Sequence, residues 1–310
     1  MIDRSAQLRR GTERDFVGYG RAVPKVRWPN DSRLALNLIV NYEEGSERNF
    51  LEDGVNEAAD IGYQPGDEYR DLSTEHGFEY GSRAGVWRLL NLFREYGVQT
   101  TFFACGQALE RNPEVAKALV AEDHEPCSHG YRWSEQWKMT RDEEREEIRR
   151  GVASIRDTCG ERPLGWYCRY GPSINTRELL VEEGGFLYDS NAYNDDLPYF
   201  VTIGEVQHLV VPYTHTYNDG RFQIAPTYGS PAAFVDNVTR GIKELWSEGA
   251  TAPKMMSVGL HPRIVGQASR LNALREIIEY ALELGDIWIA RRDHIARWWI
   301  DNHESFEAVQ

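Results

Sequence analysis

The sequence is poor in cysteine, has no long hydrophobic run and carries no excess of positive charge. Its four cysteines form no Cys-x-x-Cys pair, so we expect small buried thiols and a reducing compartment. No apolar run is long enough to span a bilayer. The net charge of −14 repels phosphate backbones and anionic lipid surfaces. This charge argues against nucleic-acid and membrane partners, and we expect a small-molecule partner instead.

The N-terminal segment lacks the apolar core of a signal peptide, because residues 1–14 are mainly charged and polar, and we therefore expect a cytoplasmic protein. Residues 1–33 are polar and contain Pro24 and Pro29, which predicts an irregular arm. The chain has 310 residues, of which 41% are hydrophobic, enough for one large core. No low-complexity linker divides it, so we predict a single domain over residues 1–310.

Short apolar runs alternate with amphipathic segments along the chain. Residues 34–40 are almost continuously apolar, as expected for a strand covered on both faces. Thr140 and Glu143 form a capping-box pattern, which predicts a helix to about residue 158. Residues 46–82 lack clear periodicity and predict a long functional or interfacial loop. About eight strand-like runs alternate with helices, so the sequence predicts an α/β fold with a barrel of parallel strands.

Polar residues follow several of these strand-like runs. They are Glu43 and Glu44, His129, Arg169, Asp189 and His261. Because the carboxyl ends of barrel strands meet at one face, we expect these side chains to converge there. Asp189 is equally compatible with a turn, since Asp-Ser-Asn is common turn chemistry. The other histidines are expected to be structural, although the loop of His215 could approach the same face.

The strand ends resemble the motifs of the polysaccharide deacetylase family, also called the NodB-homology family of carbohydrate esterases. Its first motif, Thr-Phe-Asp-Asp-Gly, resembles Asn-Tyr-Glu-Glu-Gly at residues 41–45. The resemblance implies a distorted (β/α) barrel with fewer closed strands than a full (β/α)8 barrel. It also implies that Glu43 is the general base and that Glu44 matches a metal ligand. The match of Leu260-His261 to the fifth motif implies that His261 is a general acid.

The second family motif holds a metal with two histidines four residues apart, and here these positions are His129 and Trp133. Indole has no lone pair to give to a metal, and losing one of three protein ligands should weaken zinc binding greatly. We therefore expect no metal cofactor. The alternative is a weakly bound divalent ion such as zinc on a degenerate site of Glu44 and His129. The third motif resembles Arg-Tyr-Gly-Pro at residues 169–172 only loosely.

These departures resemble one branch of the family, the PuuE-type allantoinases. The resemblance covers nearly the whole chain, in segments 15–20, 41–47, 79–85, 162–167, 182–189, 195–199 and 259–261. It implies metal-independent ring opening of allantoin to allantoate in purine catabolism, and a homotetramer. Residues 168–172 depart from the loop typical of this branch, which leaves the substrate open.

We therefore predict hydrolysis of a cyclic amide, with Glu43 as base and His261 or His129 protonating the leaving nitrogen or supporting the oxyanion. Arg169 is expected to keep Glu43 ionised and oriented. The predicted substrate-binding residues are Glu44, Trp133, Tyr170 and Asp189. Three alternatives stay open: a metal-dependent deacetylase of a carbohydrate or small N-acyl compound, a cyclic imide hydrolase, and a small-molecule-binding protein on a degenerate barrel.

Overall fold

The computed structural model describes residues 14–58, 65–225 and 227–308. Within them, nine strands form one curved sheet in the order β6-β7-β5-β4-β3-β2-β1-β8, and β9 pairs with β1. The strands are β1 Leu34–Tyr42, β2 Thr101–Ala104, β3 Glu125–Ser128, β4 Gly165–Trp166, β5 Tyr188–Asp189, β6 Tyr199–Ile203, β7 Val206–Val210, β8 Lys254–Leu260 and β9 Ile287–Ile289.

The sheet curls into a half-barrel, which confirms the α/β fold and the distorted barrel. All strand pairs are parallel except the β6–β7 hairpin. The prediction of an all-parallel barrel was wrong at this hairpin, because β6 was not recognised from the sequence. Among the described residues, no strand pairing joins the edge strands β6 and β8, so the barrel stays open on that side.

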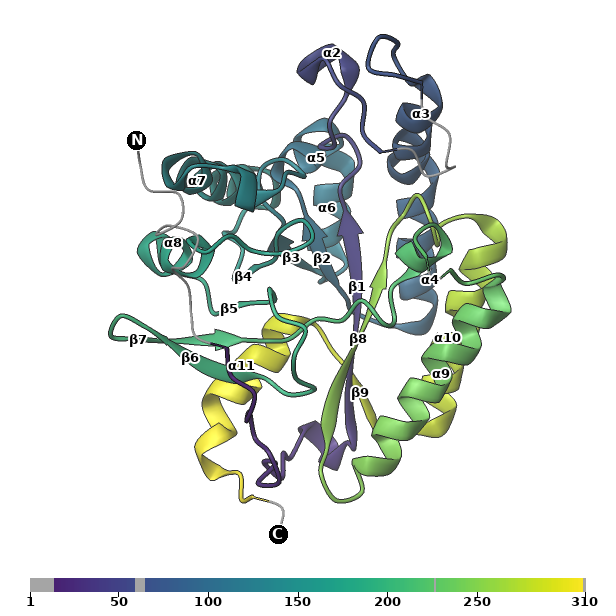
Figure 1. Ribbon diagram of the computed structural model, residues 1–310. Helices are drawn as coiled ribbons and strands as arrows, with labels where there is room; N and C mark the ends of the chain where they lie inside the picture. Colours follow the sequence, from purple (N-terminus) through teal and green to yellow (C-terminus); the bar gives the residue numbers. More distant parts are fainter. Residues whose placement is uncertain (1–13, 59–64, 226, 309–310) are drawn as a thin grey trace.

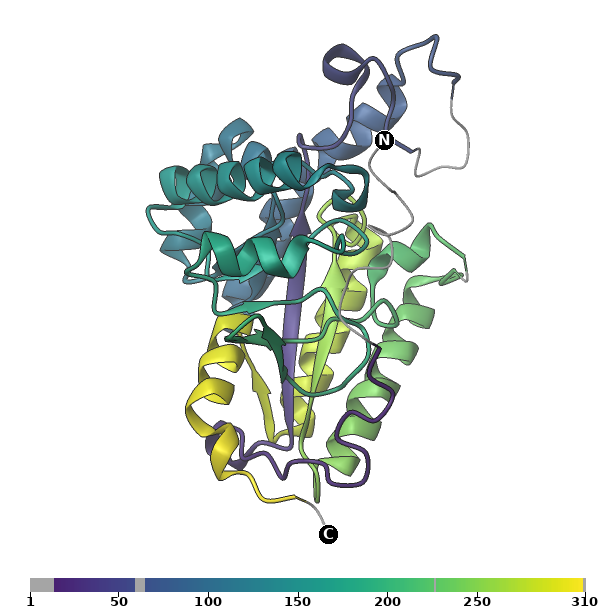
Figure 2. The same cartoon turned by 60° about the vertical axis from the view of Figure 1, so that its left-hand side comes forward.

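Helices cover the outside of the sheet (Figure 1). Helices α9 and α10 lie beside β8, and α7 and α8 lie on the opposite side of the molecule. Figure 2 places α2 and α3 beyond the carboxyl end of β1. The helices are α2 Phe50–Asp53, α3 Leu72–Tyr80, α4 Val86–Tyr96, α5 Gly106–Arg111, α6 Pro113–Ala121, α7 Arg141–Cys159, α8 Thr176–Glu183, α9 Pro231–Glu248, α10 Ala268–Leu284 and α11 Arg292–Asn302.

The central strand β1 is buried along its whole length, as its apolar sequence predicts. Leu36, Leu38 and Val40 pack among the outer helices, whereas Ala35 and Ile39 belong to the cluster inside the barrel. The strand runs two residues further than predicted, to Tyr42. Glu43 therefore leaves the sheet directly at its carboxyl edge.

The segment 46–82 was predicted to be a loop, but it contains α2 and α3. Helix α3 continues through a π-helical turn, Gly81–Gly85, into α4. A Cβ atom at Gly81 would collide with the Glu44 carboxylate, and one at Gly85 would collide with the carbonyl of Pro262. These two glycines let the helix approach both strand ends that carry the candidate site. The predicted capping box at Thr140 is confirmed and begins α7.

The arm packs on the barrel over its described part, residues 14–33. The indole N–H of Trp28 donates to the carbonyl of Lys254 at 2.9 Å, and the Tyr19 hydroxyl donates to the carbonyl of Pro198 at 2.5 Å. Residues 14–33 have no regular element apart from the 3-10 turn Pro29–Asp31, and the first thirteen residues of the predicted arm lie outside the described part. All four cysteines are buried and free, as expected. No helix of the described residues is long and apolar enough to cross a membrane.

Candidate active site

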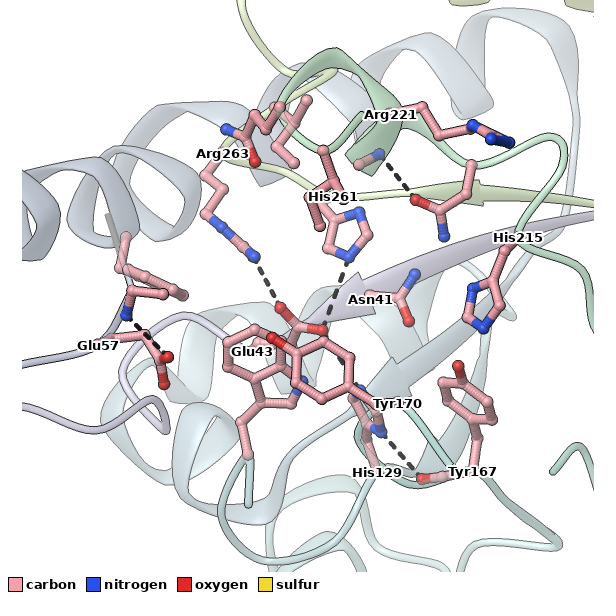
Figure 3. A pocket seen from close by; sticks show the side chains of 18 of the residues that line it. Asn41, Glu43, Glu57, His129, Tyr167, Tyr170, His215, Arg221, His261 and Arg263 are labelled. Carbon is pink, nitrogen blue, oxygen red and sulfur yellow. Dashed lines mark hydrogen bonds and ion pairs between the residues drawn. The ribbon is translucent and has the colours of Figure 1, made fainter. Parts of the chain in front are cut away.

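A cavity of about 480 Å³ opens at the carboxyl edge of the sheet, within the usual size range of small-molecule sites. Glu43 enters it after β1, His129 after β3, and His261 with Arg263 after β8. Figure 3 shows these four side chains pointing toward one another. The expected convergence of Glu43 with both histidines is confirmed.

Glu43 lies at the centre of the cluster and is only 2% exposed. Its Oε2 accepts a hydrogen bond from Nη1 of Arg263 at 2.8 Å. Its Oε1 lies 3.3 Å from Nε2 of His129 and 3.7 Å from Nε2 of His261. Burial raises the pKa of this carboxyl, but the positive charge of Arg263 and both histidines outweigh burial and lower the pKa to about 2. Glu43 is therefore ionised at neutral pH.

Both histidines are oriented through Nδ1. His129 directs Nδ1 to the carbonyl oxygen of Tyr167 at 2.9 Å, and His261 directs Nδ1 to Oδ1 of Asp219 at 2.6 Å. Because a carbonyl and a carboxylate only accept hydrogen bonds, each Nδ1 carries a proton. Each Nε2 then faces Glu43 and is the atom that can exchange a proton there.

Asp219 fixes His261 more firmly than one hydrogen bond would. Its Oδ2 accepts from the backbone N–H groups of His261 at 2.7 Å and Val265 at 3.2 Å. Burial lowers the pKa of His261, but the negative charges of Asp219 and Glu43 outweigh it and raise the pKa above its usual value. Sequence reasoning missed Asp219, since it begins a short 3-10 helix, Asp219–Phe222, and pairs with a residue 42 positions away.

Glu44 points away from the cavity. Its Oε2 accepts from the backbone N–H of Glu43 at 3.0 Å, and its Oε1 accepts from the backbone N–H of Arg263 at 3.2 Å. Burial raises the pKa of Glu44 to about 7, although Arg263 lowers it in part. The structure brings Glu44 near the base but does not place it among the residues that line the cavity.

Arg169 does not orient Glu43, and this part of the prediction was wrong. Its guanidinium donates to the two carboxylate oxygens of Glu57 at 2.7 and 2.8 Å, and to the carbonyl of Trp133 at 3.0 Å. Glu57 lies after α2 and lines the cavity. The side chain that holds Glu43 is Arg263, which the sequence did not assign to the site. Arg169 thus fixes the cavity wall.

Trp133 and Tyr170, which were predicted to bind substrate, line the cavity. The guanidinium carbon of Arg169 lies 3.6 Å from the ring centroid of Trp133 and 4.7 Å from that of Tyr170. Phe78 and Tyr167 add further aromatic surface. This wall suits a flat substrate, because planar groups stack well on aromatic rings.

Asp189 lies outside the cavity. It is fully buried and pairs with Arg177 at 3.0 Å and with Nε2 of His208 at 2.9 Å. It also accepts from the backbone N–H of Asn191 at 2.8 Å, as expected of a turn residue. The prediction that Asp189 binds substrate is not supported by this position. The turn reading, which the sequence left open, describes its contacts.

Polar residues that sequence reasoning did not assign to the site line the opposite side of the cavity. They are Asn41, His215, Asn218 and Arg221. His215 stacks on Tyr193, with ring centroids 4.2 Å apart, so its loop does reach the site. Asn41 stands within the first motif, whereas the others lie in a loop without a recognisable pattern.

The donor set does not fit a zinc ion. In the described part of the chain, no group of three or more His, Cys, Asp or Glu side chains is arranged to hold a metal. Glu44 is engaged by backbone N–H groups, and Trp133 offers no lone pair. We therefore derive no reaction step through a metal.

Comparisons with known proteins agree with this architecture. A family model described as polysaccharide deacetylase matches residues 74–186. A Schizosaccharomyces pombe protein with a provisional polysaccharide deacetylase name is 35% identical over 314 residues, which cover 94% of this chain and 98% of that protein. This chain belongs to the polysaccharide deacetylase family.

Two solved structures are highly similar to this chain over nearly its whole length. A Pseudomonas aeruginosa protein, provisionally named a polysaccharide deacetylase, is 45% identical with a TM-score of 0.90, over 94% of this chain and 99% of that one. The PuuE allantoinase is 44% identical with a TM-score of 0.90, over 94% of this chain and 98% of that one. The chain is thus a hydrolase of the deacetylase family that is about equally similar to proteins of both names.

Proposed function

We propose that this protein opens the hydantoin ring of allantoin to give allantoate, without a metal. The observation that carries the proposal is Glu43, an ionised carboxylate between Arg263 and two histidines, beside Trp133 where a metal ligand would be needed. The 44% identity to the PuuE allantoinase supports the same substrate. A place in purine catabolism follows from that substrate.

In the proposed reaction, Glu43 accepts a proton from a water molecule, whose oxygen forms a bond to a ring carbonyl carbon. The C–N bond then breaks, and His261 gives its Nε2 proton to the leaving ring nitrogen. Water is the only co-reactant, and the product gains one carboxyl and one N–H group. The raised pKa of His261 favours the protonated form that this step needs.

His129 has a separate part in this scheme. A carboxylate with a pKa of about 2 is a weak base on its own. Nε2 of His129 lies 3.3 Å from Oε1 of Glu43. Its Nδ1 donates a hydrogen bond to the carbonyl oxygen of Tyr167. We infer that His129 reacts in the form that carries a proton only on Nδ1, so that Nε2 can take the proton from Glu43. In that form His129 adds no positive charge beside the carboxylate, which makes Glu43 a stronger base than the pKa of about 2 implies.

Deacetylation of a small N-acyl compound is the second candidate. The names of the Schizosaccharomyces pombe and Pseudomonas aeruginosa relatives favour it, and the same base and acid could hydrolyse an acyclic amide. An acyclic acetamide is less activated than a strained ring, so it would need more electrostatic help at its carbonyl.

A substrate panel separates the two candidates. The full-length protein is incubated with allantoin, hydantoin, succinimide and N-acetylglucosamine, and each product is followed by proton NMR. We expect allantoin to react fastest. Faster release of acetate would refute the allantoin assignment, and binding without any turnover would favour the binding-protein alternative. The cytoplasmic location and the homotetramer stay predictions, and sedimentation velocity tests the latter.

A further inference from the structure

The guanidinium of Arg263 occupies the space beside two adjacent buried carboxylates. Its Nη1 lies 2.8 Å from Oε2 of Glu43 and 3.7 Å from Oε1 of Glu44. Its backbone N–H also donates to Glu44. The side chain is nearly buried, with 8% of the residue exposed. One cation therefore serves both carboxylates of the first motif.

Two aromatic rings hold this cation in place. The guanidinium carbon of Arg263 lies 4.4 Å from the ring centroid of Phe78 and 5.4 Å from that of Trp133, within the range of cation–π attraction. The guanidinium carbon of Arg169 also lies over the Trp133 ring, 3.6 Å from its centroid. Trp133, which stands where the family motif has a histidine ligand, thus contacts two guanidinium groups.

Two carboxylates in contact repel each other in a buried site unless a cation compensates them. In metal-dependent hydrolases the ion supplies that charge. Here the compensating charge belongs to Arg263, two residues after His261. The residue before it, Pro262, lies so close to Gly85 that a Cβ atom there would collide with its carbonyl oxygen. A guanidinium suits this place because it is always charged and is less strongly hydrated than an ammonium.

We propose that Arg263 is the resident cation of the site: it occupies the place beside Glu43 and Glu44 that a divalent metal would need, and it positions Glu43 for the reaction. The positioning part rests on the proposed function. The occupancy part does not, because it concerns only which cation the site accepts. Arg263 acts through Glu43 and is therefore a positioning residue.

Zinc titration of full-length variants tests the occupancy without any turnover. Trp133→His restores a lone-pair donor but leaves Arg263 in place, so we expect no zinc binding by calorimetry. Trp133→His with Arg263→Gln removes the resident cation, and we expect one zinc ion per chain. Trp133→His with Arg263→Lys keeps a positive charge and is expected to bind no zinc. Zinc binding by Trp133→His alone, or by none of the three, would overturn the proposal.

Turnover tests the positioning part. Arg263→Gln is expected to lower kcat for allantoin by about 100-fold or more, the usual contribution of a positioned acid or base. Arg263→Ala should regain activity in a saturable manner when millimolar guanidinium is added, which a general loss of structure would not permit. The surface variant Arg240→Gln is the matched control, because Arg240 forms an exposed pair with Asp236, and it should leave the rate unchanged.

The outcomes separate this inference from the proposed function. An Arg263→Gln rate within about twofold of the parent protein, or no rescue of Arg263→Ala by guanidinium, would overturn the positioning part, because a positioned acid–base group usually contributes far more. If the parent protein itself fails to open allantoin, the proposed function fails, and the zinc titration still decides whether Arg263 is the resident cation.

Discussion

Replacing Asp219 with asparagine changes the surroundings of the proposed acid, His261, and leaves its imidazole in place. Asp219 is fully buried and holds Nδ1 of His261 at 2.6 Å. Asparagine has nearly the same shape, but it removes the negative charge that raises the pKa of His261. We expect His261 to lose its proton at a lower pH in Asp219→Asn than in the parent protein.

The size of the change follows from the hydrogen bond. A hydrogen bond to a charged group contributes about 1.5–3 kcal/mol, and one pKa unit corresponds to about 1.36 kcal/mol. The alkaline limb of the rate profile should therefore move about one to two pH units toward acid. At a pH above both pKa values this amounts to a loss of about 10- to 100-fold, and the loss should shrink at low pH, where His261 is protonated in both proteins.

The assay is steady-state formation of allantoate, followed by proton NMR between pH 5 and pH 9. Melting curves of both proteins over the same range serve as the control for folding. An unchanged alkaline limb in Asp219→Asn would refute the role of His261 as the acid tuned by Asp219. An equal loss at every pH would point to a structural defect instead.

Three further changes test other contacts of the site. Glu43→Gln should lower kcat by about 10²- to 10⁴-fold with little change in KM, measured with allantoin. Glu44→Gln should flatten the dependence of stability on pH between pH 4 and pH 8, measured by denaturant unfolding. The reason is that the folded pKa of about 7 lies above the ordinary 4.5, so stability falls as pH rises across this window, by about 3 kcal/mol. The same pH dependence of stability in Glu44→Gln and in the parent protein would contradict this. Glu57→Gln leaves Arg169, which is 2% exposed, with a weakened buried partner and should cost about 3–5 kcal/mol in chemical unfolding. Glu79→Gln, in an exposed pair, should cost less than about 1 kcal/mol, and equal costs would contradict the burial argument.

The sequence predicts the parts of the site that have a local signal. Glu43 follows a long apolar strand, and His261 follows the apolar end of β8. His129 follows the short strand β3 in the same way. Each is placed by where its own strand ends, so periodicity and motif spacing are sufficient. The α/β class follows from the same alternation of strands and helices.

The partners of these residues are set by tertiary contacts, which have no local signal. Arg169 pairs with Glu57, 112 positions away. Arg263 reaches Glu43 over 220 positions. The sequence identifies an arginine near a strand end but does not show which of two arginines meets the base. That choice depends on how α3 and its π-helical turn pack against the strand ends.

The central claim is that Glu43 and the two histidines open allantoin without a metal. Its most direct test is the protein stripped with chelator, mixed with racemic allantoin and followed by proton NMR. The account predicts allantoate formation at the same rate as in untreated protein, and consumption that stops at half would also show selectivity for one enantiomer. Activity that returns only when zinc or manganese is restored would contradict the account, and Arg263 would then not be the resident cation.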